Sequence, residues 1–132
     1  MTIFTHFLPI TQISRYGSWL KSLDPQTLRD YFGFSLSKDG INHLITKFKR
    51  DANAHQFLIA HKDHQWAGVL HIAKAKGGVE FGVTVKKEFR RQGIADLLLS
   101  EATTWAQNRG FDSLTMHCII ENQPIQRLCD KH

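Results

Sequence analysis

Apolar residues recur every three or four positions through the first 50 residues of the chain, a spacing typical of amphipathic helices. The first set, which predicts a short helix, is Ile13, Tyr16, Leu20 and Leu23. Asp24 followed by Pro25 is typical of an N-cap and the first position of a second short helix, through Leu28 and Tyr31. Ser37 can cap a third helix. The apolar stripe of that helix is Ile41, Leu44, Ile45 and Phe48.

After residue 53 the pattern changes from helical spacing to apolar runs separated by polar turns. Residues 57–60 form a short apolar run, and a polar turn follows at 61–65. A second run covers residues 66–75 and ends at a glycine turn, and a third covers residues 79–85. Three such runs joined by tight turns predict an antiparallel meander of three strands.

The last third of the chain predicts a helix followed by a strand. The helix begins near Gly93, and Gly110 is a suitable C-terminal cap. Its expected buried side is Ile94, Leu97, Leu98, Ala102, Trp105 and Ala106. A strand follows from about residue 113 to 120, and a short helix from about residue 124. Because a helix crosses between them, we expect the third and fourth strands to be parallel. The pattern predicts one α/β (α+β) domain over residues 1–132, with a mixed, mostly antiparallel sheet flanked by helices.

Composition changes this picture little. The length of 132 residues suits one domain, and 42% hydrophobic and 22% charged residues are ordinary for a globular protein. The first residues lack the basic start and apolar run of a signal peptide, and no apolar stretch could span a membrane. Cys118 and Cys129 are too few for a disulfide framework. We therefore expect a cytoplasmic protein that does not associate with membranes.

Charge adds more, because the net charge of +5 indicates an anionic partner such as nucleic acid, a membrane surface or a phosphate-rich cofactor. The densest basic cluster is at residues 86–91, directly before the predicted helix start at Gly93. A glycine here allows a positive φ, and a helix N-terminus offers unpaired N–H donors and a positive dipole end. The segment is thus a candidate phosphate site, although a plain strand-to-helix turn with a solvated basic face would show the same residues.

Three motifs carry a family resemblance. Arg-x-x-Gly-x-Ala at residues 90–95 resembles the signature with which GNAT N-acetyltransferases hold the coenzyme A pyrophosphate. Residues 79–85 resemble the central strand of that family, with Phe89 as an aromatic residue before the loop, and residues 121–125 resemble the entry to its late helix. The resemblance covers about residues 57–131. It is strongest to the acetyltransferase domain of bacterial protein-lysine acetyltransferases.

The resemblance implies the GNAT acyl-CoA N-acyltransferase fold, with acetyl-CoA as co-substrate, an amine as acceptor and no metal. The residues implied to hold the pyrophosphate are Arg90, Arg91, Gln92, Gly93, Ile94 and Ala95. The residues implied to contact the pantetheine arm are Val83, Thr84, Val85 and Asn122. The arm would pair with the strand backbone as an added strand does, and an N–H near Val85 would be the oxyanion donor.

Glu80 is the candidate general base, because it interrupts an apolar strand in which a carboxylate is costly to bury without a purpose. Partial burial would make it a stronger base, as amine deprotonation requires, and relatives carry a glutamate at the matching position. Simple alternation places Glu80 on one face with Gly82 and Thr84. The alternative is that Glu80 faces solvent or pairs with Lys74. Cys129 stands where the family often has a tyrosine acid, and we interpret it as a small buried residue.

The chain ends at His132, where relatives usually continue with two more strands. We therefore expect an open sheet edge, which a homodimer or strand exchange could cover. The predicted function is an N-acetyltransferase that acetylates a primary amine on a small molecule, a protein lysine or an N-terminus. The alternatives are a non-catalytic acyl-CoA-binding sensor domain, which would share every cofactor motif, and a nucleic-acid-binding protein. The concentration of basic charge at one loop disfavours the latter.

Overall fold

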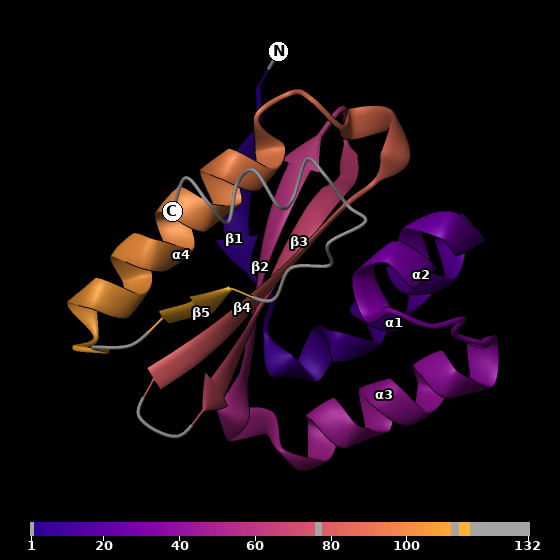
Figure 1. Cartoon of the computed structure of the whole chain (residues 1–132), viewed down its shortest axis with the longest axis horizontal. Coiled ribbons are helices and arrows are strands. Elements are labelled where there is room, and N and C mark those ends of the chain that lie inside the picture. The colour runs from indigo at the N-terminus through magenta and orange to yellow at the C-terminus, as the bar shows by residue number, and fades with distance from the viewer. Residues whose placement is uncertain (1, 76–77, 112–113, 117–132) are drawn as a thin grey trace.

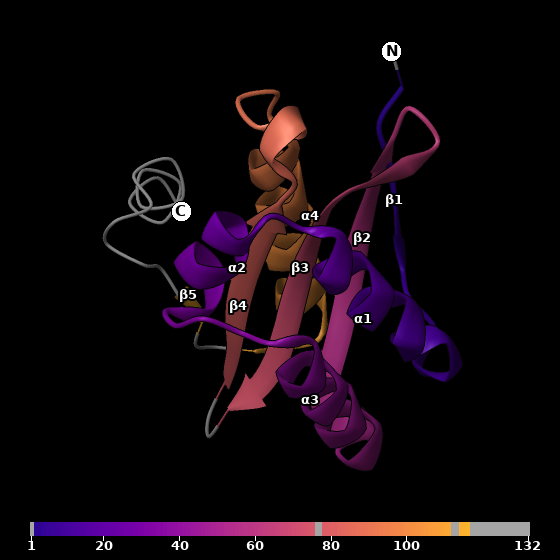
Figure 2. The same ribbon diagram turned by 90° about the vertical axis from the view of Figure 1, so that its right-hand side faces the viewer.

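The computed structural model describes residues 2–75, 78–111 and 114–116. Within these residues a mixed sheet in the order β1-β2-β3-β4-β5 separates two helical layers. Helix α4 (Ile94–Asn108) lies on one face, and α1 (Ile13–Ser22), α2 (Pro25–Phe32) and α3 (Lys38–Arg50) lie on the other (Figures 1 and 2). The strands are β1 (Phe4–Phe7), β2 (His55–Lys62), β3 (Gln65–Ala75), β4 (Gly78–Val85) and β5 (Leu114–Met116). Short 3₁₀ turns are η1 (Ile10–Gln12), η2 (Ala52–Ala54) and η3 (Lys87–Phe89).

The predicted meander and crossover are both present. Strand β3 pairs antiparallel with β2 on one side and with β4 on the other. Helix α4 then leads to β5, which pairs parallel with β4. The β2–β3 hairpin is tight, because Asp63 and His64 both have positive φ, 53° and 63°, as a two-residue turn requires. Strand β1 was not predicted. It pairs antiparallel with β2 from Phe4 opposite His61 to Phe7 opposite Leu58.

The three predicted N-terminal helices are confirmed, together with the two predicted caps. The Asp24 carboxylate accepts a hydrogen bond of 3.0 Å from the Thr27 N–H at the start of α2. The Ser37 hydroxyl accepts one of 3.0 Å from the Gly40 N–H at the start of α3. Each bond satisfies an N–H that the first turn of a helix leaves without a partner. Local sequence therefore determines where these helices begin.

Two buried apolar clusters lie on opposite sides of the sheet. The cluster under α4 includes every odd residue of β4 from Val79 to Val85, together with residues of β2, β3 and α4. The cluster under α1–α3 includes Phe57, Ile59 and Val69, which point to the other face of β2 and β3. Alternation of side chains along each strand produces this division. Both faces of the central strands are therefore covered.

The buried side of α4 differs from the prediction at three positions. Ile94, Leu98, Ala102 and Ala106 are buried as expected, but Leu97 is only half-buried and Leu99 is buried instead. Trp105 is also half-buried, and its ring lies 5.9 Å from that of Phe7 at the sheet edge. The centre of the predicted stripe is thus confirmed, and its edge includes Leu99 rather than Leu97. Trp105 packs against the margin of the buried cluster, next to Phe7 of the extra edge strand β1.

Several predictions lie outside the described residues. These concern the end of the last predicted strand, the short helix from about residue 124, Asn122, Cys118, Cys129 and the expected open edge.

Candidate functional site

The connection from β4 to α4 has the backbone of an anion site. Arg91 and Gly93 both have positive φ, 62° and 80°, and Gly93 is the N-cap of α4. Gly93 offers no capping side chain, and the first hydrogen bond of the helix runs from the Leu97 N–H to the Gly93 carbonyl at 3.0 Å. The first-turn amides of α4 therefore point to the loop without a side-chain cap, at the positive end of the helix dipole. The positive φ predicted for Gly93 is confirmed.

The backbone of Arg90 is extended, and its side chain turns toward α2. Its Nη2 donates to the Thr27 hydroxyl at 2.8 Å, and its Nε donates to the Val85 carbonyl at 3.3 Å. Thr27 is buried and in turn donates to the Asp24 carboxylate at 2.6 Å. This hydrogen bond, with a smaller contribution from the Arg90 charge, lowers the pKa of Asp24. Arg90 therefore braces the loop against the start of α2, and its role at a phosphate stays a prediction.

Arg91, Gln92 and Gly93 are exposed residues of the loop, and a buried lysine lies beside Gln92. Lys62, at the end of β2, is 8% exposed and donates a hydrogen bond to the Gln92 side-chain oxygen. The Gln92 amide nitrogen donates to the Glu88 carbonyl at 3.3 Å. Figure 2 shows that the β2–β3 hairpin and the β4–α4 loop lie at the same end of the sheet, and Lys62 is the last residue of β2 before that hairpin. No local pattern marked Lys62, because only strand pairing brings it to the loop.

The face of β4 opposite α4 carries Glu80, Gly82 and Thr84, as alternation predicted. Tyr31 of α2 covers this face, and a Cβ at Gly82 would collide with its hydroxyl oxygen and come within 3.1 Å of its Cε1. Burial raises the pKa of Tyr31 to about 12, and a hydrogen bond with the Thr84 side chain opposes the shift. Tyr31 is therefore a neutral phenol at physiological pH. Sequence reasoning treated it only as a helix residue.

Glu80 is exposed, so the predicted partial burial of its side chain is wrong. In the register of the sheet it lies opposite Ala73 on β3 and Thr115 on β5. Lys74 lies opposite Val79, so alternation sends its side chain to the other face, and no ion pair joins Lys74 and Glu80. The reason is that the helices opposite α4 leave the start of this face of β4 uncovered. The carboxylate is thus open to solvent, and its role as a base stays a prediction.

The segment expected to contact the pantetheine arm, residues 83–85, has a described neighbouring strand on one side only. Val83, Thr84 and Val85 pair on one side with β3 residues 68–70, and all three side chains are buried. On the other side β5 is described only opposite residues 79–81. Ile94 is buried beneath the start of α4, and Ala95 is half-buried beside it. The cofactor contacts of these residues stay predictions, and Asn122 lies outside the described residues.

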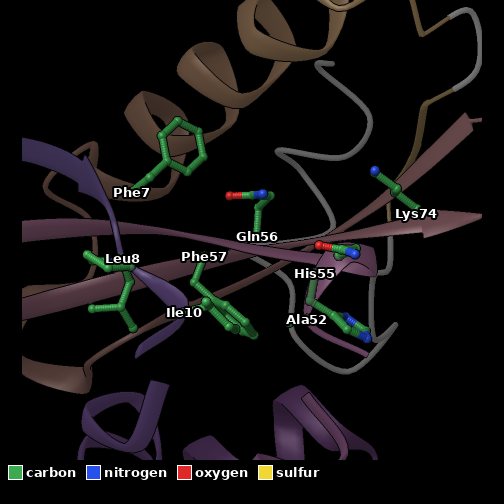
Figure 3. A pocket seen from close by; sticks show the side chains of 10 residues that line it. Phe7, Leu8, Ile10, Ala52, His55, Gln56, Phe57 and Lys74 are labelled. Atoms are coloured by element: carbon green, nitrogen blue, oxygen red, sulfur yellow. The ribbon is translucent and has the colours of Figure 1, made fainter. Parts of the chain in front are cut away.

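A hollow of about 640 Å³ lies at the opposite end of the sheet, where β2 begins and β3 ends. Figure 3 shows Phe7, Gln56 and Lys74 on the side of α4, with His55 and Phe57 pointing to the other side. The residues that line the hollow include none of the predicted site residues. We therefore assign it no part in the candidate site.

Membrane and metal sites can be considered only for the described residues. None of the helices there combines the length and apolarity needed to cross a membrane. Likewise, residues 2–75, 78–111 and 114–116 bring no three His, Cys, Asp or Glu side chains together as a metal site would require.

Solved structures share the fold at low sequence identity. A predicted acetyltransferase from Clostridium acetobutylicum with acetyl-CoA has a TM-score of 0.73 and 19% identity, over 96% of this chain and 87% of that one. The aminoglycoside N-acetyltransferase AAC(6')-Iy with CoA has a TM-score of 0.70 and 18% identity, over 98% and 86%. A ribosomal-protein-alanine N-acetyltransferase from Brucella melitensis has a TM-score of 0.69 and 15% identity, over 98% and 89%.

Two of these neighbours have acceptors in their names, an aminoglycoside and a ribosomal-protein alanine, so the finer resemblance to protein-lysine acetyltransferases is not confirmed. No curated protein sequence matches the chain. The model of the acetyltransferase (GNAT) family matches residues 19–132, which is most of the chain and includes the predicted loop and central strand. The chain therefore belongs to the GNAT acetyltransferase family.

Proposed function

We propose that this protein is an N-acetyltransferase that transfers the acetyl group of acetyl-CoA to a primary amine by direct attack, with Glu80 as general base. The observation that carries the proposal is the placement of two features on one stretch of chain. An uncapped helix N-terminus with positive φ at Arg91 and Gly93 follows β4 after the short η3 turn, and β4 presents the exposed Glu80 carboxylate. A phosphate-binding loop and a candidate base are therefore carried by one continuous segment.

The loop residues fit a diphosphate. The first-turn amides of α4 and the exposed Arg91 supply N–H donors and positive charge, and Gly93 has no side chain to obstruct them. Neighbours that contain acetyl-CoA or CoA support the same cofactor here. The backbone of residues 83–85 and Asn122 would contact the pantetheine arm.

When bound, acetyl-CoA would supply an activated thioester. Glu80, which is open to solvent, would accept a proton from the attacking amine, directly or through water. A backbone N–H near Val85 would donate to the carbonyl oxygen as its charge develops. As the amide forms, the C–S bond would break, and the CoA thiolate would leave and take up a proton from water. The acceptor is a primary amine on a small molecule, a protein lysine or a protein N-terminus. The names of two structural neighbours, an aminoglycoside N-acetyltransferase and a ribosomal-protein-alanine N-acetyltransferase, include a small molecule and a protein as acceptors.

Calorimetric titration with acetyl-CoA tests the cofactor site. Gly93→Asp places a carboxylate at the N-cap, where it would repel a diphosphate, and we expect at least a hundredfold loss of affinity. Gly110→Asp is a matched control, since Gly110 has nearly the same φ, 77° against 80°, and a Cβ at either position meets nothing within 4 Å. Equal binding by wild type and Gly93→Asp would refute the phosphate loop.

Release of the CoA thiol in a screen of amines tests catalysis. Lysine peptides, peptide N-termini and aminoglycosides represent the acceptor classes. Glu80→Gln should lower turnover by roughly 10²–10⁴-fold and leave acetyl-CoA affinity unchanged, as expected for loss of a general base. Tight binding without turnover by the wild-type chain on any amine would instead favour an acyl-CoA sensor.

A further inference from the structure

Lys62 is a buried cation whose charge is not balanced by a described carboxylate. Its side chain is 8% exposed, and its Nζ donates to the neutral amide oxygen of Gln92. Among the described residues no Asp or Glu oxygen lies within 4.0 Å of this nitrogen. A buried ammonium without a counter-ion is costly, because a neutral amide recovers only part of the lost hydration energy.

Two other cations of the β4–α4 connection, Lys86 and Arg90, are engaged differently. Lys86 forms an ion pair of 3.6 Å with Glu88 and donates to the Gln65 amide oxygen at 3.0 Å. Arg90 donates to the Thr27 hydroxyl of α2 and to the Val85 carbonyl of β4, so its described partners lie outside the exposed residues of the loop. Lys62 differs from both, because it is buried and its partner, Gln92, is an exposed residue of the loop itself.

Gln92 holds this arrangement in place. Its amide nitrogen donates to the Glu88 carbonyl, which directs its oxygen toward Lys62. Gln92 also lies between Arg91 and Gly93, the two residues with positive φ at the uncapped start of α4. The positive end of the helix dipole adds to the local excess of positive charge, so an anion at this loop would stabilise Lys62 as well as the helix.

We propose that Lys62 is a cofactor-binding residue whose ammonium neutralises the diphosphate of acyl-CoA at the β4–α4 loop, with Gln92 holding the ammonium beneath the loop before the cofactor binds. The inference rests on the proposed function, because acyl-CoA is the source of the diphosphate. It extends the binding site to the β2–β3 hairpin, which contains none of the loop motif. The 3′-phosphate is not assigned to Lys62, since Gln92 belongs to the diphosphate loop.

Calorimetric titration of Lys62→Met with CoA and with 3′-dephospho-CoA tests the proposal. Methionine retains most of the apolar stem and removes the charge. We expect both ligands to bind about tenfold or more weakly, because a hydrogen bond between charged groups is lost. Lys86→Met is the matched control and should have a much smaller effect, and Lys62→Arg should retain most of the affinity. A loss seen only with CoA would overturn the assignment to the diphosphate.

Thermal unfolding separates a binding role from a structural one. Without ligand, Lys62→Met should have an unchanged or higher Tm, since it removes a buried charge without a counter-ion. The rise in Tm caused by saturating CoA should be smaller than for wild type. A lower Tm without ligand together with loss of binding by Lys62→Arg would indicate a structural role and overturn the proposal.

The outcomes also distinguish this inference from the proposed function. Wild-type protein that fails to bind CoA would refute the proposed function and this inference with it. Wild-type binding matched within about twofold by Lys62→Met would refute the role of Lys62 alone and leave the proposed function standing.

Discussion

The two faces of β4 differ in what covers them. Toward α4, the residues Val79, Phe81, Val83 and Val85 are all buried in one apolar cluster with the helix. Toward α1–α3, the same strand carries the exposed Glu80, a glycine and the buried Thr84, and Tyr31 reaches over from α2. One face of the strand is filled completely, and the other combines a carboxylate, a hydroxyl and a missing side chain.

This difference indicates a division between stability and function. A filled apolar face contributes most to the free energy of folding but leaves no polar group for chemistry. The other face gives up apolar burial and offers polar groups near the candidate cofactor loop. Arg90 connects the β4–α4 loop with this face, because it is hydrogen-bonded to Thr27 of α2, the helix that carries Tyr31. The comparison can be tested by changing each face separately.

The largest effect on stability should come from the face toward α4. Leu98 is fully buried there, so Leu98→Ala should lower the free energy of unfolding by about 2–5 kcal/mol through lost burial and a cavity. Leu97→Ala, at the half-buried neighbour on the same helix, should cost much less. Denaturant unfolding measures both. Equal losses at the two positions would contradict the assignment of Leu98, rather than Leu97, to the buried stripe.

A smaller effect should come from filling the empty position on the other face. Gly82→Ala would push the added Cβ against the Tyr31 hydroxyl, and we expect a loss of about 1–3 kcal/mol from this overpacking. Denaturant unfolding measures the change, and Tyr31→Ala in the same background should relieve most of it, as a double-mutant cycle would show. If the cost of Gly82→Ala is the same with and without the Tyr31 ring, Tyr31 does not cover this glycine.

The sequence predicted those parts of the molecule that depend on neighbours along the chain. The caps at Asp24 and Ser37 and the positive φ at Gly93 are set by interactions within a few residues. The meander of β2, β3 and β4 could be predicted because its apolar runs are long and the turns between them are short. The family motif then identified the loop after β4, and residues 19–132 match the family. Local rules therefore accounted for most of the described fold.

The features that were missed depend on partners far apart in the sequence. The four residues of β1 are too few to show a pattern, and they become a strand only by pairing with β2. Lys62 meets Gln92, and Tyr31 meets Gly82, through tertiary packing alone. The exposure of Glu80 follows from how far the helices extend along β4, which alternation cannot predict. Sequence reasoning thus identified the strand and loop of the site but not the residues that surround them.

The smallest effect should be a dependence of stability on pH from the face toward α1–α3. His71 lies opposite Gly82 in the register, stacks on Phe57 with ring centroids 4.6 Å apart, and has its Nε2 2.8 Å from His55 Nδ1. Burial, with smaller contributions from His55 and Lys47, lowers the pKa of His71 to about 3. Burial also lowers the pKa of His55.

Between pH about 6.5, where an unfolded histidine titrates, and about 3, the unfolded chain binds a proton that folded His71 does not. The free energy of unfolding should therefore fall as pH falls, by at most about 1.4 kcal/mol per pH unit for this one proton. Denaturant unfolding from pH 7 to 5 measures the slope, which His71→Leu should reduce and His43→Gln, on the exposed side of α3, should leave near the wild-type value. An unchanged slope in His71→Leu would mean that the acid sensitivity has another origin. His71 would then give the face toward α1–α3 no pH dependence of its own.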